Sequence, residues 1–182
     1  MTVDSFSFIR NYCRAVEAGA EIVDGEDKTG GYIMKRAVLN EAKLEFPSRS
    51  SNEGFARSAA ACFAAQADPT LSELEDIKTA VSEAVTNAII YAYPESIGTV
   101  YMRMRIYQEN LLEVTVRDRG AGIADVERAR QPMFTTGGEE RSGMGFTIME
   151  SFMDSVTVRS APGRGATVVM RKRLSEKPKA GK

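Results

Sequence analysis

Three short segments with acidic, amide and glycine residues most constrain what this chain can fold into. In Ser82-Glu83-Ala84-Val85-Thr86-Asn87 a carboxylate and a carboxamide stand four residues apart, so they share one face of a helix. In Asp118-Arg119-Gly120-Ala121-Gly122 an acid at the end of a strand pattern precedes two glycines. In Ser142-Gly143-Met144-Gly145-Phe146 two glycines open a helix, whose free N–H groups can bind phosphate. The first segment could supply a base or metal ligand, the second could recognise a nucleobase, and the third could bind phosphate. Together they predict an ATP site. No Walker-type Gly-x-x-x-x-Gly-Lys-Ser/Thr run occurs.

The composition favours one domain of ordinary size and excludes several kinds of site. The 182 residues are 43% hydrophobic, enough for a core, and a net charge of −1 gives no global field for nucleic acid. Cys13 and Cys62 are too few and too far apart for a disulfide framework or a zinc site, which fits a cytoplasmic location. No apolar run approaches the ~20 residues of a membrane span. The chain has no histidine, so none can be a metal ligand, a general base or a phosphate acceptor.

The pattern along the chain divides it into three parts. Residues 1–40 are predicted to be a poorly ordered extension with one short amphipathic helix over 6–16, because glycines interrupt anything longer. Residues 41–174 form the domain. Residues 175–182 end a basic C-terminal tail, which we interpret as solvated.

Periodicity predicts the elements of the domain. In chain order they are a strand at 44–46 ending at Pro47, a helix over 52–66, a helix over 74–91, strands over 100–106 and 112–116 joined as a hairpin, a short helix near 125–130, a loop at 131–141, a helix over 145–152 and two last strands. Ser50 and Glu53 predict a capping box before the first helix. In the last two strands Val156 and Val158, and then Thr167 and Val169, are predicted to face inward. The sum is an α/β two-layer sandwich with a largely antiparallel sheet covered by helices on one face.

These segments, in this order, resemble a known family. An acid–Asn helix, Asp-x-Gly-x-Gly, a lid loop, Gly-x-Gly and Gly-x-Thr are similar to the Bergerat ATP-binding fold of gyrase, Hsp90, histidine kinases and MutL. Within that group, the stretches 44–53, 82–90, 129–136 and 141–150 are similar to the bacterial anti-sigma factor serine kinases, in particular those of the sigma-F type from endospore formers. The resemblance spans about Lys43 to Leu174. After Ile90 the family often has His-Gly or His-Ala, whereas Tyr91-Ala92-Tyr93 stands here.

The resemblance implies roles for the first segment. Glu83 would be catalytic, accepting the proton of the attacking hydroxyl or orienting it; without a histidine, the base must be a carboxylate or absent. Asn87 would bind the nucleotide and hold Mg²⁺ through its amide oxygen. Taken singly, a helical Glu is usually a solvated charge, and it is the companion Asn87 that favours a site.

The second segment would recognise adenine. Asp118 would accept a hydrogen bond from the adenine amine, since an ionised carboxylate is acceptor-only. Gly120 and Gly122 would let the backbone approach the base, and Thr167 would support the acid. Read alone, Asp118 could equally cap a loop and Thr167 could be an ordinary strand residue.

The third segment and the loop before it would hold the phosphates. The resemblance implies nucleotide contacts from Thr135, Thr136, Gly143, Met144, Gly145 and Phe146. Arg141 would be the catalytic cation on the γ-phosphate, because a guanidinium makes paired charge-assisted hydrogen bonds.

The resemblance also implies partners. A sigma factor of the sigma-F type would be bound in part through Arg57, and an anti-anti-sigma protein would be the serine substrate of a homodimeric kinase using ATP and Mg²⁺. Alternatives remain open: a kinase regulating a sigma-B-type factor, a detached histidine-kinase domain, an ATPase switch of chaperone or mismatch-repair type, or a nucleotide-sensing module without turnover. The sequence gives no sign of direct nucleic acid or membrane binding.

Overall fold

The computed structural model describes residues 21–26, 32–133 and 143–175. Its elements are β1 (Glu21–Glu26), β2 (Tyr32–Lys35), β3 (Val38–Pro47), α2 (Ser51–Ala64), the 3₁₀ turn η1 (Ala65–Ala67), α3 (Leu71–Tyr91), β4 (Thr99–Tyr107), β5 (Leu111–Arg117), α4 (Val126–Ala129), α5 (Gly145–Phe152), β6 (Ser155–Ser160) and β7 (Ala166–Arg173). None of the described helices is long and apolar enough to cross a membrane.

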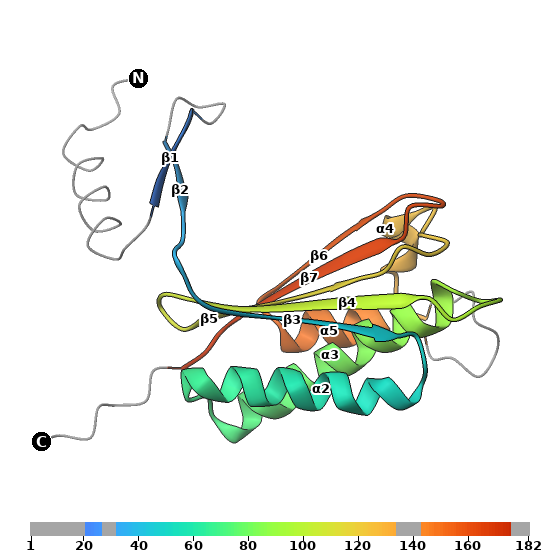
Figure 1. Ribbon diagram of the computed structural model, residues 1–182, viewed down its shortest axis with the longest axis horizontal. Coiled ribbons are helices and arrows are strands. Elements are labelled where there is room, and N and C mark those ends of the chain that lie inside the picture. Colours follow the sequence, from blue (N-terminus) through green and yellow to red (C-terminus); the bar gives the residue numbers. More distant parts are fainter. Residues whose placement is uncertain (1–20, 27–31, 134–142, 176–182) are drawn as a thin grey trace, which may run out of the picture.

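A five-stranded antiparallel sheet in the order β3-β4-β5-β7-β6 forms one layer. Helices α2, α3 and α5 lie together against one side of it (Figure 1). Alternation drives this arrangement, because every second residue of β4 is buried and the residues between are only partly so. The predicted two-layer α/β sandwich is confirmed.

Small residues let the helices approach the sheet closely. Helix α3 buries an apolar stripe at helical spacing, and helix α5 buries Met149 completely. The stripe of α3 is made of Ile77, Ala80, Val81, Ala84, Val85 and Ala88. It meets inward residues of the central strands such as Met102, Val114 and Met170. Three alanines in the stripe bring α3 near the sheet, where its last turns can share a cavity with the strand ends.

Strand β3 is longer than the alternation at 44–46 predicted. It begins at Val38 and pairs with β4 along its whole length. Its first residues are exposed, so they leave no hydrophobic pattern; backbone hydrogen bonds to β4 extend the strand instead.

The extension before β3 contains more structure than we expected. Strands β1 and β2 pair antiparallel and form a separate two-stranded sheet. The helix predicted over 6–16 and the last residues of the C-terminal tail lie outside the described residues.

The capping box predicted at Ser50 is wrong. Ser50 has helical backbone angles and makes no side-chain cap, while Glu53 instead accepts a hydrogen bond from Ser82 Oγ at 2.7 Å. The box occurs at Thr70 and Glu73, which cap α3 reciprocally. A tertiary contact between α2 and α3 thus takes the carboxylate that the local pattern assigned to a cap.

The inward positions predicted for β7 are also wrong by one residue. The register places Val168 opposite Val116 and Val158, and both Val168 and Met170 are buried. Thr167 and Val169 face the other side of the sheet. Because side chains alternate with period two, a shift of one residue exchanges the two faces.

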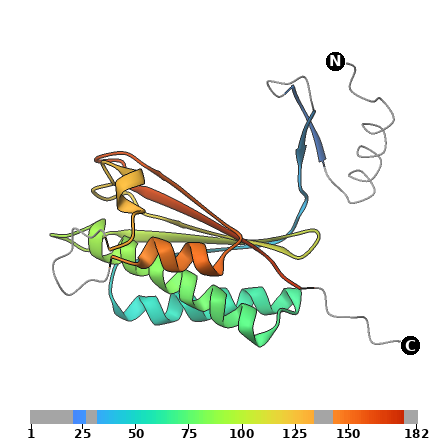
Figure 2. The same cartoon turned by 180° about the vertical axis from the view of Figure 1, so that it is seen from behind.

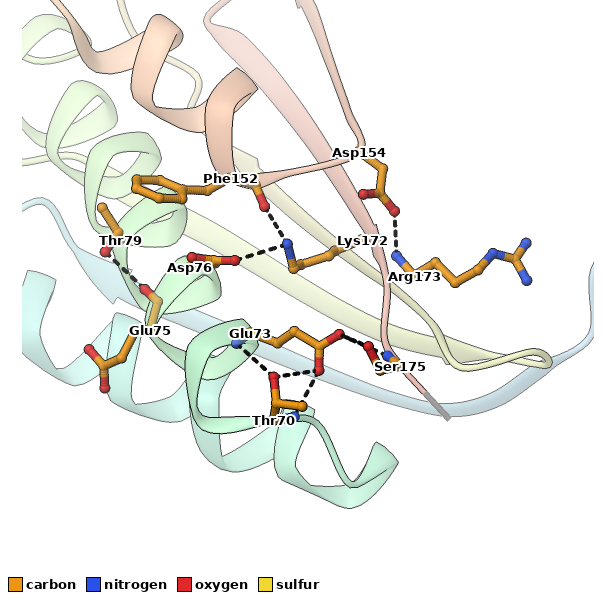
Figure 3. Close-up of polar contacts among 10 residues, drawn as sticks. All are labelled: Thr70, Glu73, Glu75, Asp76, Thr79, Phe152, Asp154, Lys172, Arg173 and Ser175. Atoms are coloured by element: carbon orange, nitrogen blue, oxygen red, sulfur yellow. Dashed lines mark hydrogen bonds and ion pairs between the residues drawn. The ribbon is translucent and has the colours of Figure 1, made fainter. Parts of the chain in front are cut away.

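A cluster of polar contacts joins the end of β7 to α3 and α5 (Figure 3). Lys172 Nζ donates to the carbonyl of Phe152, the last residue of α5, at 2.7 Å and lies 3.1 Å from Asp76 Oδ2. A cation at a helix C-terminus complements the helix dipole. Just beyond, the backbone N–H and the hydroxyl of Ser175 each donate to Glu73 Oε1 at 2.8 Å. The α3 cap therefore also fastens the end of the sheet.

Glu73 makes folding stability pH-dependent. Partial burial alone would raise its pKa, but hydrogen bonds from Thr70 and Ser175 outweigh it and lower the pKa from 4.5 to about 2. Stability from a lowered carboxyl pKa is fully present above the unfolded value and is lost as pH falls through the folded one. We expect Glu73→Gln to cost ~0.5–2 kcal/mol at pH 7, and this deficit should shrink between pH 4.5 and 2.

Urea unfolding at a series of pH values measures the effect of this substitution. Glu75→Gln, on the same turn but with an exposed carboxylate, is the matched control and should leave the pH profile of the wild type unchanged. A deficit for Glu73→Gln that stays constant down to the acid limit would contradict the assignment.

Candidate active site

A cavity of about 740 Å³ opens where the end of α3, the ends of β5 and β7 and the start of α5 meet. This volume suits a ligand of nucleotide size. The side chains and backbone that line it come from Glu83, Ala84, Thr86, Asn87, Ala88, Ile90, Tyr91, Ala92, Val116, Asp118, Ala121, Gly122, Ile123, Ala124, Asp125, Arg128, Ala129, Gly143, Met144, Gly145, Phe146, Ala166 and Val168. Residues from all three polar segments of the sequence line this one cavity.

Glu83 and Asn87 lie one turn apart on α3 and face the first turn of α5. A Cβ atom placed on Gly145 would stand 3.0 Å from Glu83 Oε2 and 3.2 Å from Asn87 Nδ2. Gly145 therefore leaves room for both polar side chains where the N–H groups of α5 begin. This contact brings a carboxylate, an amide and a helix N-terminus together.

Asp118 is a buried acid at the floor of the cavity, with a relative exposure of 5%. The N–H groups of Gly120 and Ala166 donate to the same oxygen, Oδ1, at 3.0 and 3.1 Å. Oδ2 is thus left to accept from a donor in the cavity. Burial raises the pKa of the Asp118 carboxyl, and these two backbone hydrogen bonds oppose the rise.

Gly120 lies behind the cavity wall and does not line the cavity itself. A Cβ atom there would come within 2.0 Å of the Ala92 carbonyl oxygen, which accepts a hydrogen bond from Ala121 N–H at 2.8 Å. Gly122 has φ +73° and approaches the Ala161 carbonyl. Glycines at both positions permit this close backbone packing. Of the two, Gly122 lines the cavity and Gly120 does not.

Tyr93 stabilises the same loop from outside. Its hydroxyl donates to the Thr99 carbonyl and accepts from Arg119 N–H, both at 2.9 Å. The triplet Tyr91-Ala92-Tyr93 departs from the His-Gly or His-Ala of the family. In it, Tyr91 lines the cavity, Ala92 supplies the carbonyl that accepts from Ala121, and Tyr93 holds the loop through its hydroxyl.

The phosphate end of the cavity is formed by four consecutive residues. Gly143 has φ +62°, Met144 is the N-cap of α5, and Gly145 and Phe146 begin the helix. Met144 makes no side-chain cap hydrogen bond, and the N–H groups in the first turn of a helix can donate to a ligand. An anion is the ligand best suited to this position.

Comparison with known proteins agrees with this geometry. The family profile described as Histidine kinase-like ATPase domain matches residues 46–172. Anti-sigma F factors from Bacillus velezensis and Bacillus subtilis (strain 168) are each 55% identical over 141 residues, covering 76% of this chain and 96% of theirs. The one from Pasteuria penetrans is 56% identical over 143 residues, covering 78% and 93%.

The chain belongs to the anti-sigma F factor family. Residues 46–172 form a domain of the histidine kinase-like ATPase type, which implies that the chain binds ATP. A solved structure agrees in fold: the RsbU and RsbW domains of Rv1364c from Mycobacterium tuberculosis match with a TM-score of 0.57 at 17% identity, covering 79% of this chain and 35% of that one.

Within the cavity that this ATPase domain provides, the predicted residues divide into three groups. Those that line it are Glu83, Asn87, Asp118, Gly122, Gly143, Met144, Gly145 and Phe146. Thr135, Thr136 and Arg141 lie outside the described residues. Thr167, Gly120 and Arg57 do not line the cavity, and Arg57 is an exposed residue of α2 that lies 3.6 Å from Glu53.

Thr167 fails as the support of Asp118 because of its register. It pairs with Arg117, on the face of the sheet away from the helices. Ala166 occupies the adjacent position, and its backbone N–H supplies the support expected from Thr167.

Several lining residues escaped the sequence interpretation. Ile90, Tyr91 and Ile123 contribute apolar parts of the wall, Asp125 is the N-cap of α4, and Arg128 lies within α4. Ile90 and Tyr91 extend the Glu83–Asn87 face of the helix by one more turn, so helical spacing in the sequence could have identified them. Nothing local marks Asp125 and Arg128, since only the folded loop brings α4 over the cavity.

The donor set fits Mg²⁺ bound through a nucleotide. Among the described residues no cluster of three or more His, Cys, Asp or Glu could hold a metal by itself. Asn87 offers one hard oxygen beside Glu83. Mg²⁺ is commonly bound by one or two protein oxygens, with phosphates and water completing its six ligands.

Asp118→Asn should weaken ATP binding by roughly 10- to 100-fold, since a hydrogen bond to a charged group contributes ~1.5–3 kcal/mol. The amide can place an N–H₂ opposite the adenine amine. Calorimetric titration with ATP measures the effect. Glu113→Gln, which changes another buried acid on the opposite face of the sheet, should keep ATP affinity; equal losses in both variants would assign Asp118 a purely structural role.

Proposed function

We propose that this chain is an ATP-dependent protein serine kinase that also sequesters a sigma factor of the sigma-F type. Its substrate would be a serine of an anti-anti-sigma protein. The observation that supports the kinase activity is the approach of Glu83 and Asn87 to Gly145 at the N-terminus of α5, where the carboxylate could act as the base and the amide oxygen could bind the metal.

Glu83 is the residue suited to activate the acceptor. In the transfer, the serine oxygen bonds to the γ-phosphorus, the bond from that phosphorus to the β,γ-bridging oxygen breaks, and the serine proton passes to the Glu83 carboxylate. Mg²⁺, when bound, neutralises charge on the β- and γ-phosphate oxygens. The N–H groups of α5 and its dipole stabilise phosphate charge, and Asp118 fixes the adenine so that the γ-phosphate lies near Glu83.

A chain of contacts links the proposed partner surface to this site. Arg57 on α2 pairs with Glu53, and Glu53 accepts a hydrogen bond from Ser82, the residue before Glu83. A partner that binds at Arg57 would therefore act two contacts away from the catalytic residue. The names of the relatives, anti-sigma F factors, support a sigma factor as one partner. A homodimer is part of the same proposal.

A nucleotide-sensing module without turnover is the second candidate, and a sigma-B-type factor is an alternative partner. Incubation with γ-labelled ATP and candidate anti-anti-sigma proteins separates the first pair. Pull-down with both kinds of sigma factor separates the second. Label on a serine of the acceptor supports the kinase, whereas ATP binding without transfer to any of these acceptors supports the sensing module.

Glu83→Gln should slow phosphoryl transfer by roughly 10²–10⁴ while ATP affinity stays near that of the wild type, since a positioned base contributes about that factor. Single-turnover transfer of labelled phosphate measures the rate and calorimetry the affinity. Glu75→Gln, two turns earlier on α3 and outside the cavity, is the control and should keep the wild-type rate. A Glu83→Gln enzyme with a normal rate would end this assignment.

Arg141→Ala should narrow the difference between ATP and ADP in partner binding while sparing adenine recognition. A ligand shifts an equilibrium only through an interaction that differs between states, and a guanidinium on the γ-phosphate would be that interaction. Sigma-factor affinity with each nucleotide provides the readout, with Arg164→Ala, in the turn before β7, as the matched loss of one charge. Undiminished discrimination in Arg141→Ala would show that another residue senses the γ-phosphate.

A further inference from the structure

The face of the sheet that the helices leave open is strongly basic. Its charged residues are Glu41, Lys43 and Glu45 of β3, Arg103 and Arg105 of β4, Glu113 and Arg117 of β5, Arg159 of β6, and Arg171 and Arg173 of β7. Seven basic against three acidic residues give this outer face a formal charge of +4, whereas the whole chain has −1. A face of this kind attracts an acidic partner.

Part of this charge has no counterion on the face. Ion pairs there use Lys43, Arg105, Arg171 and Arg173, and none of the described ion pairs uses Arg103, Arg117 or Arg159. The three unpaired arginines are on β4, β5 and β6, so they cross the sheet rather than follow one strand.

Two buried polar atoms at the centre of the outer face lack hydrogen bonds. Arg103 Nε and Thr115 Oγ1 have no partner within the described part of the chain, and these residues are directly opposite each other on β4 and β5. Thr115 has a relative exposure of only 8%. A buried unsatisfied polar group costs ~1–3 kcal/mol, so a ligand that supplies acceptors here would relieve that cost.

The outer face is also hollowed at the end where the N-terminal extension enters the sheet. A cavity of about 830 Å³ there is lined by Arg36, Val38, Arg105, Tyr107, Leu111, Glu113, Asp154, Ser155, Arg171 and Arg173. Arg36 belongs to the two-residue link between β2 and β3. The extension is therefore tethered at the rim of this hollow.

The extension carries acidic residues around β1, although residues 1–40 as a whole have a formal charge of only −1. Between residues 17 and 27 the sequence has five Asp or Glu residues and no Lys or Arg, and three of those acids, Glu21, Asp24 and Glu26, belong to β1. Figures 1 and 2 both show the β1–β2 hairpin on the opposite side of the sheet from α2 and α3, beyond the first residues of β3. The acidic strand and the basic face thus lie on one side of the molecule.

The hairpin also needs a packing partner. Its two strands pair only with each other, and an isolated two-stranded hairpin is at best marginally stable in water. A short tether gives the docked form a high effective concentration, of millimolar order for short flexible links.

We propose that the acidic hairpin β1–β2 of this chain docks onto the basic outer face of its own sheet. Its carboxylates pair with Arg103, Arg117 and Arg159, which make none of the described ion pairs, and they accept hydrogen bonds at Arg103 and Thr115. The nucleotide cavity is bounded by α3 and α5 on the other face, so docking covers the outer face without closing the ATP site.

Paramagnetic broadening in the full-length chain tests the proposal. A nitroxide on Gly25→Cys, in a Cys13→Ser/Cys62→Ser background, keeps the three acids of β1. It should reduce the amide peak intensities of Thr115, Thr157 and Val169 on the outer face. A label on native Cys62, an exposed residue of α2, with Cys13→Ser, is the matched control and should spare those three peaks.

Charge provides the second arm of the same experiment. In the Gly25-labelled chain, Glu21→Lys/Glu26→Lys should abolish the broadening, and the matched pair Glu75→Lys/Glu95→Lys, at an exposed residue of α3 and an exposed residue of the loop after it, should preserve it. Raising ionic strength from about 0.1 M to about 1 M shortens the Debye length from ~10 Å to ~3 Å and should also weaken it.

Each outcome decides the proposal. Broadening within one chain supports the proposal if the charge-reversing pair Glu21→Lys/Glu26→Lys removes it. Absence of broadening, or broadening that survives the reversal, overturns it. Broadening seen only when a labelled chain is mixed with a separate ¹⁵N chain also overturns it, since a second copy would then cover the face.

Discussion

The contact between the start of α5 and the last turns of α3 is the constraint on which the site depends. The absence of a side chain lets Gly145 lie close to Glu83 and Asn87, because a Cβ atom there would be only 3.0 Å from the Glu83 carboxylate. Alanines in the buried stripe of α3 hold that helix close to the sheet, and Met149 holds α5 against the same core. Core packing thereby sets the distance between a carboxylate, an amide and a helix N-terminus.

The position of Asp118, at the other end of the site, also depends on close packing. Two backbone N–H groups fix one of its oxygens, and glycines allow the loop after it to pack against the Ala92 carbonyl. Tyr93 then holds that loop from outside through two hydrogen bonds. This end of the cavity therefore depends mainly on backbone contacts, which side-chain patterns display poorly.

The two faces of the sheet differ in polarity. Apolar residues at alternate positions bury one face beneath the helices, and the other carries arginines and the buried carboxylate of Glu113. Glu113 accepts from Arg171 at 2.8 Å and lies within ion-pair distance of Arg105, so the face includes an ionic network around one buried carboxylate. A buried carboxylate needs such cationic partners, and the arginines beside it that make no described ion pair are the ones that the acidic hairpin would complement.

The sequence by itself determined the helices, the central strands and the three polar segments, because helical spacing, alternation and glycine placement are local properties. Glu83, Asn87, Asp118 and Gly145 could be named for that reason. Only the tertiary structure decided the rest. Pairing with β4 extended β3 to include its exposed first residues. Glu53 accepts a hydrogen bond from Ser82 instead of capping a helix, and Thr167 faces away from the cavity. Strand register and the approach of α4 depend on contacts between distant residues, and a single shift of one position reverses which face a side chain occupies.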